Sequence, residues 1–426
     1  MTLVLKVGSL IDGRGGDPIL DAVVVVDDGV ITACGPRGEV LEPEGAEVLE
    51  APGHTAMPGM IDCHVHMMAH SLRLEDRLTT YPTVALFMAA KHLDLTLRAG
   101  FTTVRDAGGA DPGLRQALER GLIPGPRLLV AAAVGQTGTH LESYFPTGVK
   151  LNVGGTTATR ICDGPDQARR VVREAMREGF DLIKICTTGG ALSPQDSPNF
   201  TELTIEEITA IVETAASYGR TVMAHAQGTQ GIKNAIRAGV WSVEHGSVQD
   251  DEATRMFVDT GTYLVPTLTV AHWVLDHGRE AGVPEASLQK GAELNSFHFD
   301  SIRRAVRAGV KMAVGTDALG AMHGSNAKEL ELLVTEAGLT PMEAIVAATK
   351  TGAEVCRLAD RVGTIEAGKR ADLLLVDGDP LEDIRLLQDK ERLTVFKDGR
   401  LVVSGAAGSS LSPAARRGGP PAHPRP

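Results

Sequence analysis

Between residue 58 and about residue 360, short apolar runs alternate with helical patterns, and this alternation limits the possible folds more than any other property of the chain. It is the sequence form of a parallel α/β structure. Eight such strands with intervening helices fit a (β/α)8 barrel. A doubly wound open sheet is the alternative, but no GxGxxG motif follows the first run to supply the usual nucleotide site of that fold. The eight runs cover residues 59–67, 102–107, 127–135, 182–187, 221–226, 242–246, 263–269 and 311–316.

The two ends of the chain consist instead of short β segments. Asp27-Asp28-Gly29 separates two apolar runs near the N-terminus, and Asp398-Gly399 separates two others near the C-terminus. An Asp-Gly turn between apolar runs predicts a β-hairpin. From residue 405 onward the chain has little to bury, which predicts disorder. We therefore expect a small β domain built from both ends, an inserted barrel and a tail, with boundaries at residues 1–57, 58–360, 361–404 and 405–426.

Composition and charge exclude several classes of protein. The formal net charge of -12 argues against a nucleic-acid-binding protein and against attachment to an anionic membrane. The N-terminus lacks the pattern of a signal peptide, and no apolar run is long enough to span a membrane. The five cysteines include no CxxC pair, and an odd number is a poor disulfide framework. We expect a soluble cytoplasmic protein with reduced thiols.

A His-x-His motif lies at the end of the first apolar run. Side chains of a strand alternate between its two faces, so His64 and His66 should point to the same side. Two imidazoles that converge from one strand form half of a metal site. For this pair alone, a chance proximity of two histidines is an equally good explanation.

Further polar residues occur where apolar ones are expected. His225 and His245 lie at the ends of the fifth and sixth runs, and Asp317 directly follows the eighth. Lys184 lies within the fourth run between two isoleucines, where a bare ammonium is costly to bury. Any one of them could be a satisfied polar residue of the core. Their joint position at one end of successive strands favours a shared site, because barrels place their chemistry at that end.

This pattern resembles the amidohydrolase superfamily. The family has HxH after strand 1, a lysine on strand 4, histidines on strands 5 and 6, and an aspartate after strand 8. The terminal β segments also look like the small β-sandwich of that superfamily, and residues 363–373 resemble a segment common in its members. The runs DLIKICTTGG and MAHAQG are most similar to the imidazolonepropionase-related and Xaa-Pro dipeptidase-like branch. This chain supplies every member of the metal-binding pattern in order, as His64, His66, Lys184, His225, His245 and Asp317.

The resemblance implies two divalent metal ions, most often zinc. The HxH pair and Asp317 would hold one ion, and His225 and His245 would hold the other. Lys184, carbamylated by carbon dioxide, would bridge the two ions, which accounts for a lysine in an apolar strand. A plain ammonium at this position would instead favour a single metal, as in the imidazolonepropionases, and this alternative stays open.

The mechanism follows from such a site. Metal coordination lowers the pKa of bound water to about 7, and the resulting hydroxide attacks a carbonyl carbon. Asp317 is expected to take the proton of the nucleophile and pass it to the departing amine. His140, after the third run, matches a position where relatives polarise the substrate carbonyl. Tyr144, Gln227 and His323 are further candidates for substrate contact, although some peptidase-like relatives carry a tyrosine in place of Gln227.

We therefore expect a metal-dependent hydrolase that cleaves an amide bond in a small molecule, and the resemblance to the nearest branch implies a dipeptide or an N-acyl amino acid as the leading substrate class. A cyclic amide, a carbamate or a urea-type compound is the alternative, because the same hydroxide attacks any of these carbonyls. A scaffold protein without catalytic activity is a third reading, but such relatives tend to lose metal ligands. Relatives often form large assemblies, so we also expect a homo-oligomer.

Overall fold

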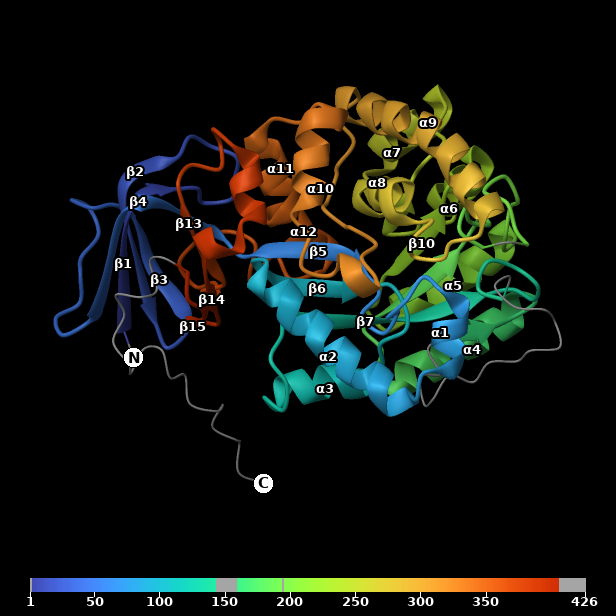
Figure 1. Cartoon of the computed structure of the whole chain (residues 1–426), viewed down its shortest axis with the longest axis horizontal. Helices are drawn as coiled ribbons and strands as arrows, with labels where there is room; N and C mark the ends of the chain where they lie inside the picture. The colour runs from blue at the N-terminus through green and yellow to red at the C-terminus, as the bar shows by residue number, and fades with distance from the viewer. Residues whose placement is uncertain (1, 143–158, 194, 406–426) are drawn as a thin grey trace.

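The computed structural model describes residues 2–142, 159–193 and 195–405, which form a barrel flanked by a β-sheet domain (Figure 1). The chain begins in the sheet domain, passes through the whole barrel and returns to the sheet domain at its end. The predicted fold class, a (β/α)8 barrel with a β-sandwich made from both chain ends, is confirmed.

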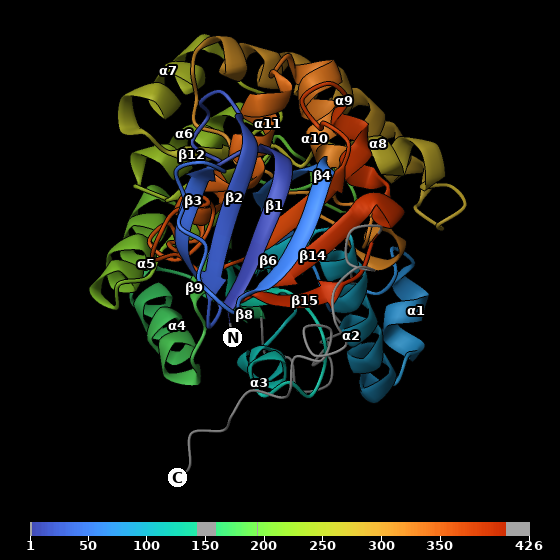
Figure 2. The ribbon, with the colours of Figure 1, turned by 90° about the vertical axis from the view of Figure 1, so that its left-hand side faces the viewer.

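The terminal domain contains one seven-stranded sheet in the order β15-β14-β13-β4-β1-β2-β3. Figure 2 shows β1 to β4 side by side in front of the barrel. The sheet folds over on itself, because Ile31 N donates to Lys369 O at 2.8 Å and closes the edge of β3 against the segment before β13. This folding encloses an apolar core that includes Leu5, Leu49 and Phe396. The strands are β1 (Thr2–Leu10), β2 (Ile19–Asp27), β3 (Val30–Pro36), β4 (Glu47–Pro58), β13 (Leu373–Asp377), β14 (Leu393–Lys397) and β15 (Arg400–Val403).

Both predicted hairpins are present, and their turns meet. Asp28 and Gly29 have φ of 49° and 80°, and Asp398 and Gly399 have φ of 50° and 74°. Positive φ at both central residues is the two-residue turn that suits the twist of paired strands. A Cβ atom on Gly399 would lie 2.6 Å from Gly29 Cα, so the turns from the two chain ends pack directly together.

The barrel wall consists of parallel strands in the order β5-β6-β7-β9-β10-β11-β12. The first six predicted runs agree closely in position with the observed strands, whereas the seventh, residues 263–269, forms a strand only over Tyr263–Val265 and then enters α8 (Leu268–His277). A further short strand, β8 (Thr159–Ile161), pairs with the carboxyl end of β7 and is not part of this strand order. The wall strands are β5 (Met60–Val65), β6 (Phe101–Asp106), β7 (Arg127–Gly135), β9 (Leu182–Cys186), β10 (Val222–Ala226), β11 (Ser242–His245) and β12 (Tyr263–Val265).

The eighth predicted run, residues 311–316, closes the barrel without forming a regular strand. Ala313 N donates to Leu264 O of β12 at 3.0 Å, and Cys63 N of β5 donates to Val314 O at 2.8 Å. Gly315 brings this segment close to its neighbours, since a Cβ atom there would lie 2.3 Å from a Val265 methyl carbon. The crowded closure explains why the hydrogen bonding is irregular at this position.

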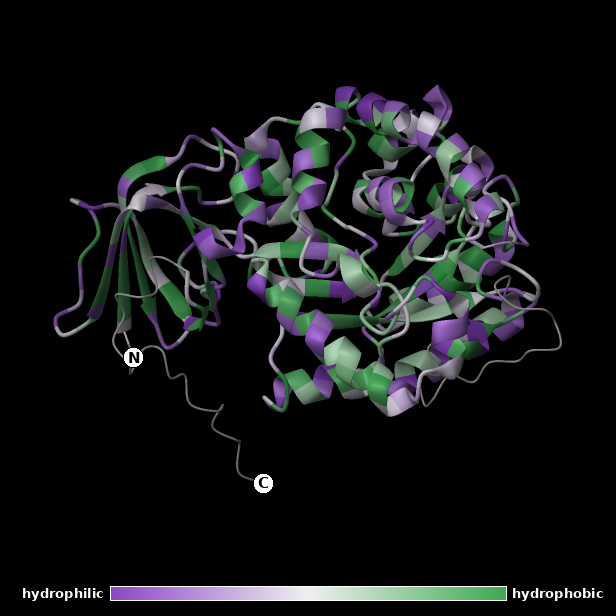
Figure 3. Ribbon diagram, in the orientation of Figure 1, coloured by the Kyte–Doolittle hydropathy of each residue, from purple (hydrophilic) through white to green (hydrophobic). Residues whose placement is uncertain are grey.

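The helices surround the wall and bury one face each. On α4, for example, the buried residues Ala168, Val171, Val172 and Ala175 recur at helical spacing and pack on the wall. Figure 3 shows the same alternation of hydrophobic and hydrophilic residues along the outer helices. Among the described residues, no helix is long and apolar enough to cross a membrane. The helices are α1 (Leu74–Thr79), α2 (Pro82–Arg98), α3 (Pro112–Glu119), α4 (Pro165–Glu178), α5 (Ile205–Ser217), α6 (Thr229–Arg237), α7 (Asp251–Thr260), α8 (Leu268–His277), α9 (Glu285–Arg307), α10 (Lys328–Leu332), α11 (Pro341–Ala348) and α12 (Lys350–Val355).

Candidate metal centre

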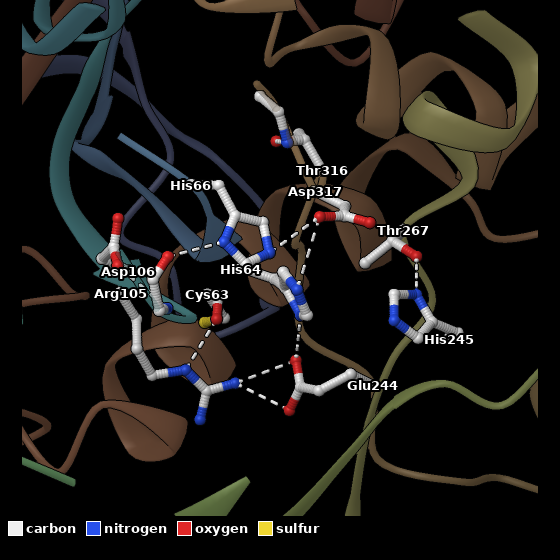
Figure 4. Close-up of polar contacts among 12 residues, drawn as sticks. Cys63, His64, His66, Arg105, Asp106, Glu244, His245, Thr267, Thr316 and Asp317 are labelled. Atoms are coloured by element: carbon white, nitrogen blue, oxygen red, sulfur yellow. Dashed lines mark hydrogen bonds and ion pairs between the residues drawn. The ribbon is translucent and has the colours of Figure 1, made fainter. Parts of the chain in front are cut away.

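Four of the predicted ligands meet at the carboxyl ends of the barrel strands. His64 lies on β5, His66 directly follows it, His245 ends β11, and Asp317 follows the closing segment (Figure 4). One ligand atom each from His64, His245 and Asp317 lie within 4.8 Å of one another. His66 Nε2 lies 3.2 Å from Asp317 Oδ1, and His64 Nε2 lies 3.5 Å from the same oxygen. Three imidazoles therefore face one carboxylate.

His225, at the end of β10, extends this cluster on its other side. Its ring lies at a centroid distance of 4.6 Å from that of His245, which in turn lies 5.2 Å from that of His64. The rings thus form a continuous row across the mouth of the barrel. The five predicted ligands other than Lys184 are brought together in this row and at Asp317.

One ring nitrogen of each β5 histidine is tied to the protein. His64 Nδ1 lies 2.8 Å from a carboxylate oxygen of Glu244, and His66 Nδ1 lies 2.8 Å from Gly108 O. Both oxygens are acceptors, so Nδ1 carries a proton in both rings. Nε2 of His64 keeps its lone pair, whereas Nε2 of His66 faces the carboxylate of Asp317 and shares a proton with it until a metal takes its place. Asp106 holds the loop that presents the Gly108 carbonyl, because Gly108 N donates to its carboxylate at 2.9 Å. His64 Nε2 is buried and has no hydrogen-bond partner among the described residues.

In the other two histidines, His245 and His225, one ring nitrogen is likewise bound to an oxygen acceptor of the protein. His245 Nδ1 lies 2.7 Å from the hydroxyl oxygen of Thr267, which itself donates to Pro266 O at 2.7 Å and so accepts from the ring. His225 uses the opposite nitrogen, because Nε2 lies 3.1 Å from Gly189 O. His245 Nε2 and His225 Nδ1 therefore keep their lone pairs. Oriented neutral imidazoles with one free lone pair each are the donors that divalent metals bind, so the residues present fit a metal centre.

Two of these residues have strained backbones. His245 has φ of 69° and Asp317 has φ of 54°, which is the left-handed region that residues with a Cβ atom rarely adopt. Each such residue costs on the order of 1–3 kcal/mol and persists only where the surroundings enforce it. Strain at two convergent polar residues is typical of a functional site.

Burial and charge keep His64, His225, His245 and Asp317 in a metal-binding protonation state. Burial lowers the pKa of His64, His225 and His245 well below the ordinary value, and the charge of Lys184 lowers it further. Burial acts to raise the pKa of Asp317, but its contacts with the β5 histidines outweigh this effect and lower that pKa to about 2. Burial also acts to lower the pKa of His66, but its hydrogen bond with Asp317 outweighs this effect and raises that pKa. Neutral imidazoles beside an ionised carboxylate are the forms that coordinate metal ions.

Lys184 lies in the middle of β9, and its side chain is almost completely buried. Among the described residues, no hydrogen bond or ion pair to its ammonium is found. Its charge nevertheless acts on His64, His225, His245 and Asp317, which locates it beside the cluster. A buried cation without an acceptor is costly, so this position favours a chemical change of the amine or a bound anion.

His140, the predicted catalytic histidine, lies next to the row of rings. It stacks on His225 with a centroid distance of 4.4 Å, and its Nδ1 lies 2.9 Å from a carboxylate oxygen of Asp196. Its backbone N–H donates to Glu202 at 2.8 Å. Burial raises the pKa of Glu202 to about 8.

The predicted substrate contacts differ in their surroundings. Gln227 follows β10, and its side-chain oxygen is buried with no hydrogen-bond partner in the described part of the chain. His323 is buried behind His66, where it stacks on His92 at 4.4 Å and lies 3.4 Å from His66 O. Tyr144 lies outside the described residues. These contacts stay predictions.

Sequence reasoning missed the residues that orient the ligands. Glu244 and Arg105 form a fully buried ion pair next to His64, with Arg105 Nη2 3.0 Å from Glu244 Oε1. Asp62 and Thr267 hold the neighbouring backbone and ring. A signal was present, because Arg105 and Glu244 interrupt apolar strands as conspicuously as the histidines do. Their pairing partner could not be found without the order of strands in the barrel.

A parallel barrel with a histidine and aspartate cluster at the carboxyl ends of its strands defines a class of hydrolases. The model of the amidohydrolase family matches residues 55–402 of the chain. The chain therefore belongs to the amidohydrolase family.

Particular relatives are similar over nearly the whole length. Ochratoxinase from Aspergillus niger is 33% identical over 420 residues, which covers 93% of this chain and 86% of that protein. The crystal structure of a prolidase complexed with N-methylphosphonate-L-proline is 36% identical, with a TM-score of 0.89 over 95% of this chain and all of that one. A Xaa-Pro dipeptidase with bound methionine in the active site is 33% identical, with a TM-score of 0.86 and the same coverage. The predicted family and its imidazolonepropionase-related and Xaa-Pro dipeptidase-like branch are thus confirmed.

Proposed function

We propose that this protein is a binuclear metal-dependent amidohydrolase that cleaves the amide bond of a dipeptide or an N-acyl amino acid, with Xaa-Pro dipeptides as the first substrates to test. The observation that carries the proposal is the convergence of His64, His245 and Asp317, whose ligand atoms lie within 4.8 Å of one another. The similarity to a prolidase and to a Xaa-Pro dipeptidase supports the substrate class.

In this proposal His64, His66 and Asp317 would hold one metal, and His225 and His245 would hold the second. The Lys184 amine, after release of its protons to solvent, would add to carbon dioxide and form a carbamate, whose negative charge would suit a ligand shared by the two metals. When bound, the metal pair supplies Lewis-acid chemistry that acidifies a water molecule and polarises the scissile carbonyl. Zinc suits the imidazole-rich donor set.

The protein itself supplies proton transfer and orientation. Asp317 takes the proton of the attacking water and delivers it to the amide nitrogen, which leaves poorly as an anion. His140, held through Nδ1 by Asp196 and stacked on His225, polarises the substrate carbonyl from the side of the second metal position. The strained backbone at Asp317 keeps its carboxylate aimed at the histidines.

The test is turnover of zinc-loaded protein on a panel of Xaa-Pro dipeptides, other dipeptides and N-acyl amino acids, with bound metal counted in each sample. Asp317→Asn should lower kcat/KM on any substrate by at least about 10³-fold, because it removes a metal ligand and the proton carrier together. Asp259→Asn, at an exposed aspartate of α7, is the matched control and should keep full activity.

Protein that holds two metals per chain and yet cleaves none of these compounds would exclude the substrate class. The search would then pass to cyclic amides, carbamates and urea-type compounds. Protein that holds no metal after careful reconstitution would exclude the metal-dependent mechanism itself.

A further inference from the structure

The four histidines of the centre differ in what holds them. His66 and His225 are tied to backbone carbonyls, and His245 is tied to a hydroxyl. Apart from the contacts with the candidate ligand Asp317 itself, only His64 among the described candidate ligands is tied to a carboxylate, that of Glu244 at 2.8 Å. A charged acceptor makes the stronger hydrogen bond and increases the basicity of the ring more than a neutral one does.

Glu244 is held in turn by Arg105, and both side chains are shielded from solvent. Arg105 Nη2 donates to the two carboxylate oxygens at 3.0 and 3.2 Å, and Ser242 donates to Oε1 at 2.5 Å. Removing two charges from water is costly, and the pair returns that cost only if its hydrogen bonds are satisfied. Both carboxylate oxygens of Glu244 have hydrogen-bond partners, so the buried ion pair meets this condition.

Arg105 also holds the backbone that carries His64. Its Nε donates to Cys63 O at 2.6 Å, one residue before the histidine. The guanidinium therefore fixes His64 at two points, through the main chain of β5 and through the carboxylate on its ring (Figure 4). The dipole of the ion pair has its negative end toward His64 and its positive end away from it, which favours a cation on the far side of the ring.

We propose that Arg105 and Glu244 are positioning residues that fix the tautomer and direction of His64 and thereby set the affinity of one metal position, the one that His64 shares with His66 and Asp317. This inference rests on the metal centre of the proposed function, and it is independent of the substrate class. It predicts an asymmetry between the two metals, because the rings at the second position have neutral partners.

The guanidinium of Arg105 also extends toward the amino end of β11, where Nη1 donates to Ser242 Oγ at 3.1 Å, and Arg105 lines a cleft at that mouth of the barrel. This cleft has a volume of about 1250 Å³. Its lining includes Arg105 of β6 and residues of β14 and β15. Three further lining residues, Arg127, Leu182 and Thr221, lie at or next to the amino ends of barrel strands. A small cation that enters the cleft could occupy the space left by a shortened Arg105. This geometry makes chemical rescue by guanidinium possible.

The experiment is a zinc titration of full-length protein against a chromophoric chelator, which reads affinity without any substrate. Wild-type protein should bind two zinc ions per chain. Glu244→Gln should weaken one of the two by about 10- to 100-fold and leave the other within about 3-fold. Glu329→Gln is the matched control, since Glu329 is equally buried but bonds to the first turn of α8 and touches no ligand ring.

Arg105→Ala should weaken the same single zinc ion, and millimolar guanidinium should restore part of that affinity, whereas ethylammonium should restore less because it lacks the fork of donors. If Glu244→Gln fails to fold, Arg105→Lys gives the test, with an expected loss of about 3- to 10-fold at one position.

Wild-type affinity at both positions in Glu244→Gln, or an equal loss at both, would overturn the inference while leaving the proposed function intact. Equal losses in Glu244→Gln and Glu329→Gln would likewise overturn it, because the replacement of any buried glutamate would then suffice. Failure of the wild-type protein to bind zinc would instead reject the proposed function.

Discussion

Replacement of Asp62 by alanine should destabilise the folded protein by roughly 3–9 kcal/mol. Asp62 is fully buried and accepts four hydrogen bonds from the groups around the metal ligands. The donors are His64 N at 3.1 Å, Thr316 N at 3.1 Å, Thr316 Oγ1 at 2.6 Å and Asn326 Nδ2 at 2.7 Å. A buried donor that loses its acceptor costs about 1–3 kcal/mol, and the threonine hydroxyl alone can rotate to another acceptor. The remaining three unsatisfied donors give the expected loss.

Urea unfolding of metal-free protein, followed by circular dichroism, measures this loss without the added stability of bound metal. Asp62→Asn keeps the shape and one acceptor oxygen but turns an amide group toward Asn326, so it should cost less, about 1–2 kcal/mol. A double-mutant cycle with Asn326→Ala should give a coupling energy above about 0.5 kcal/mol. A loss below 1 kcal/mol in Asp62→Ala, or equal losses in the alanine and asparagine variants, would refute the reasoning.

Two other perturbations test the buried charges. Burial raises the pKa of Glu329 to about 8, so the folded protein keeps a proton that the unfolded chain releases above about pH 4.3. The resulting penalty grows between pH 4.5 and 8, and Glu329→Gln should abolish that part of the fall in the free energy of unfolding, about 3–5 kcal/mol; equal pH profiles for both proteins would count against it. Lys184→Ala should lose bound metal and activity, and acetate or propionate should restore both; unmodified lysine density in a metal-loaded crystal would contradict the carboxylated form.

Local signals in the sequence were reliable wherever the physics is local. The Asp-Gly turns at residues 28–29 and 398–399 adopt positive φ, as their residue types favour. Thr204 and Glu207 have the Thr-x-x-Glu spacing typical of a capping box, and they form one at the start of α5. The eighth run is the exception, because close packing around Gly315 replaces regular pairing by separate hydrogen bonds. Tertiary crowding decided that detail.

The convergence of the candidate ligand residues could be predicted because strand position alone determines where their side chains point. His64 and His66 share a side by the alternation of a strand, and residues at the carboxyl ends of parallel strands meet at one mouth of the barrel. The partners that orient these ligands could not be predicted. Glu244 contacts His64 although the two residues are 180 positions apart in the sequence, and Thr267 contacts His245 at a separation of 22 positions.

The sequence by itself thus determined the alternation of elements, the turns and the identity of the convergent polar side chains, because each depends on residue type and spacing along one stretch of chain. Only the tertiary structure decided which nitrogen of each histidine is free, which carboxylate is tied to Arg105, and how Asp317 is held in a strained backbone. Those properties depend on contacts between strands distant in sequence, whose distances and angles are fixed only when the barrel closes.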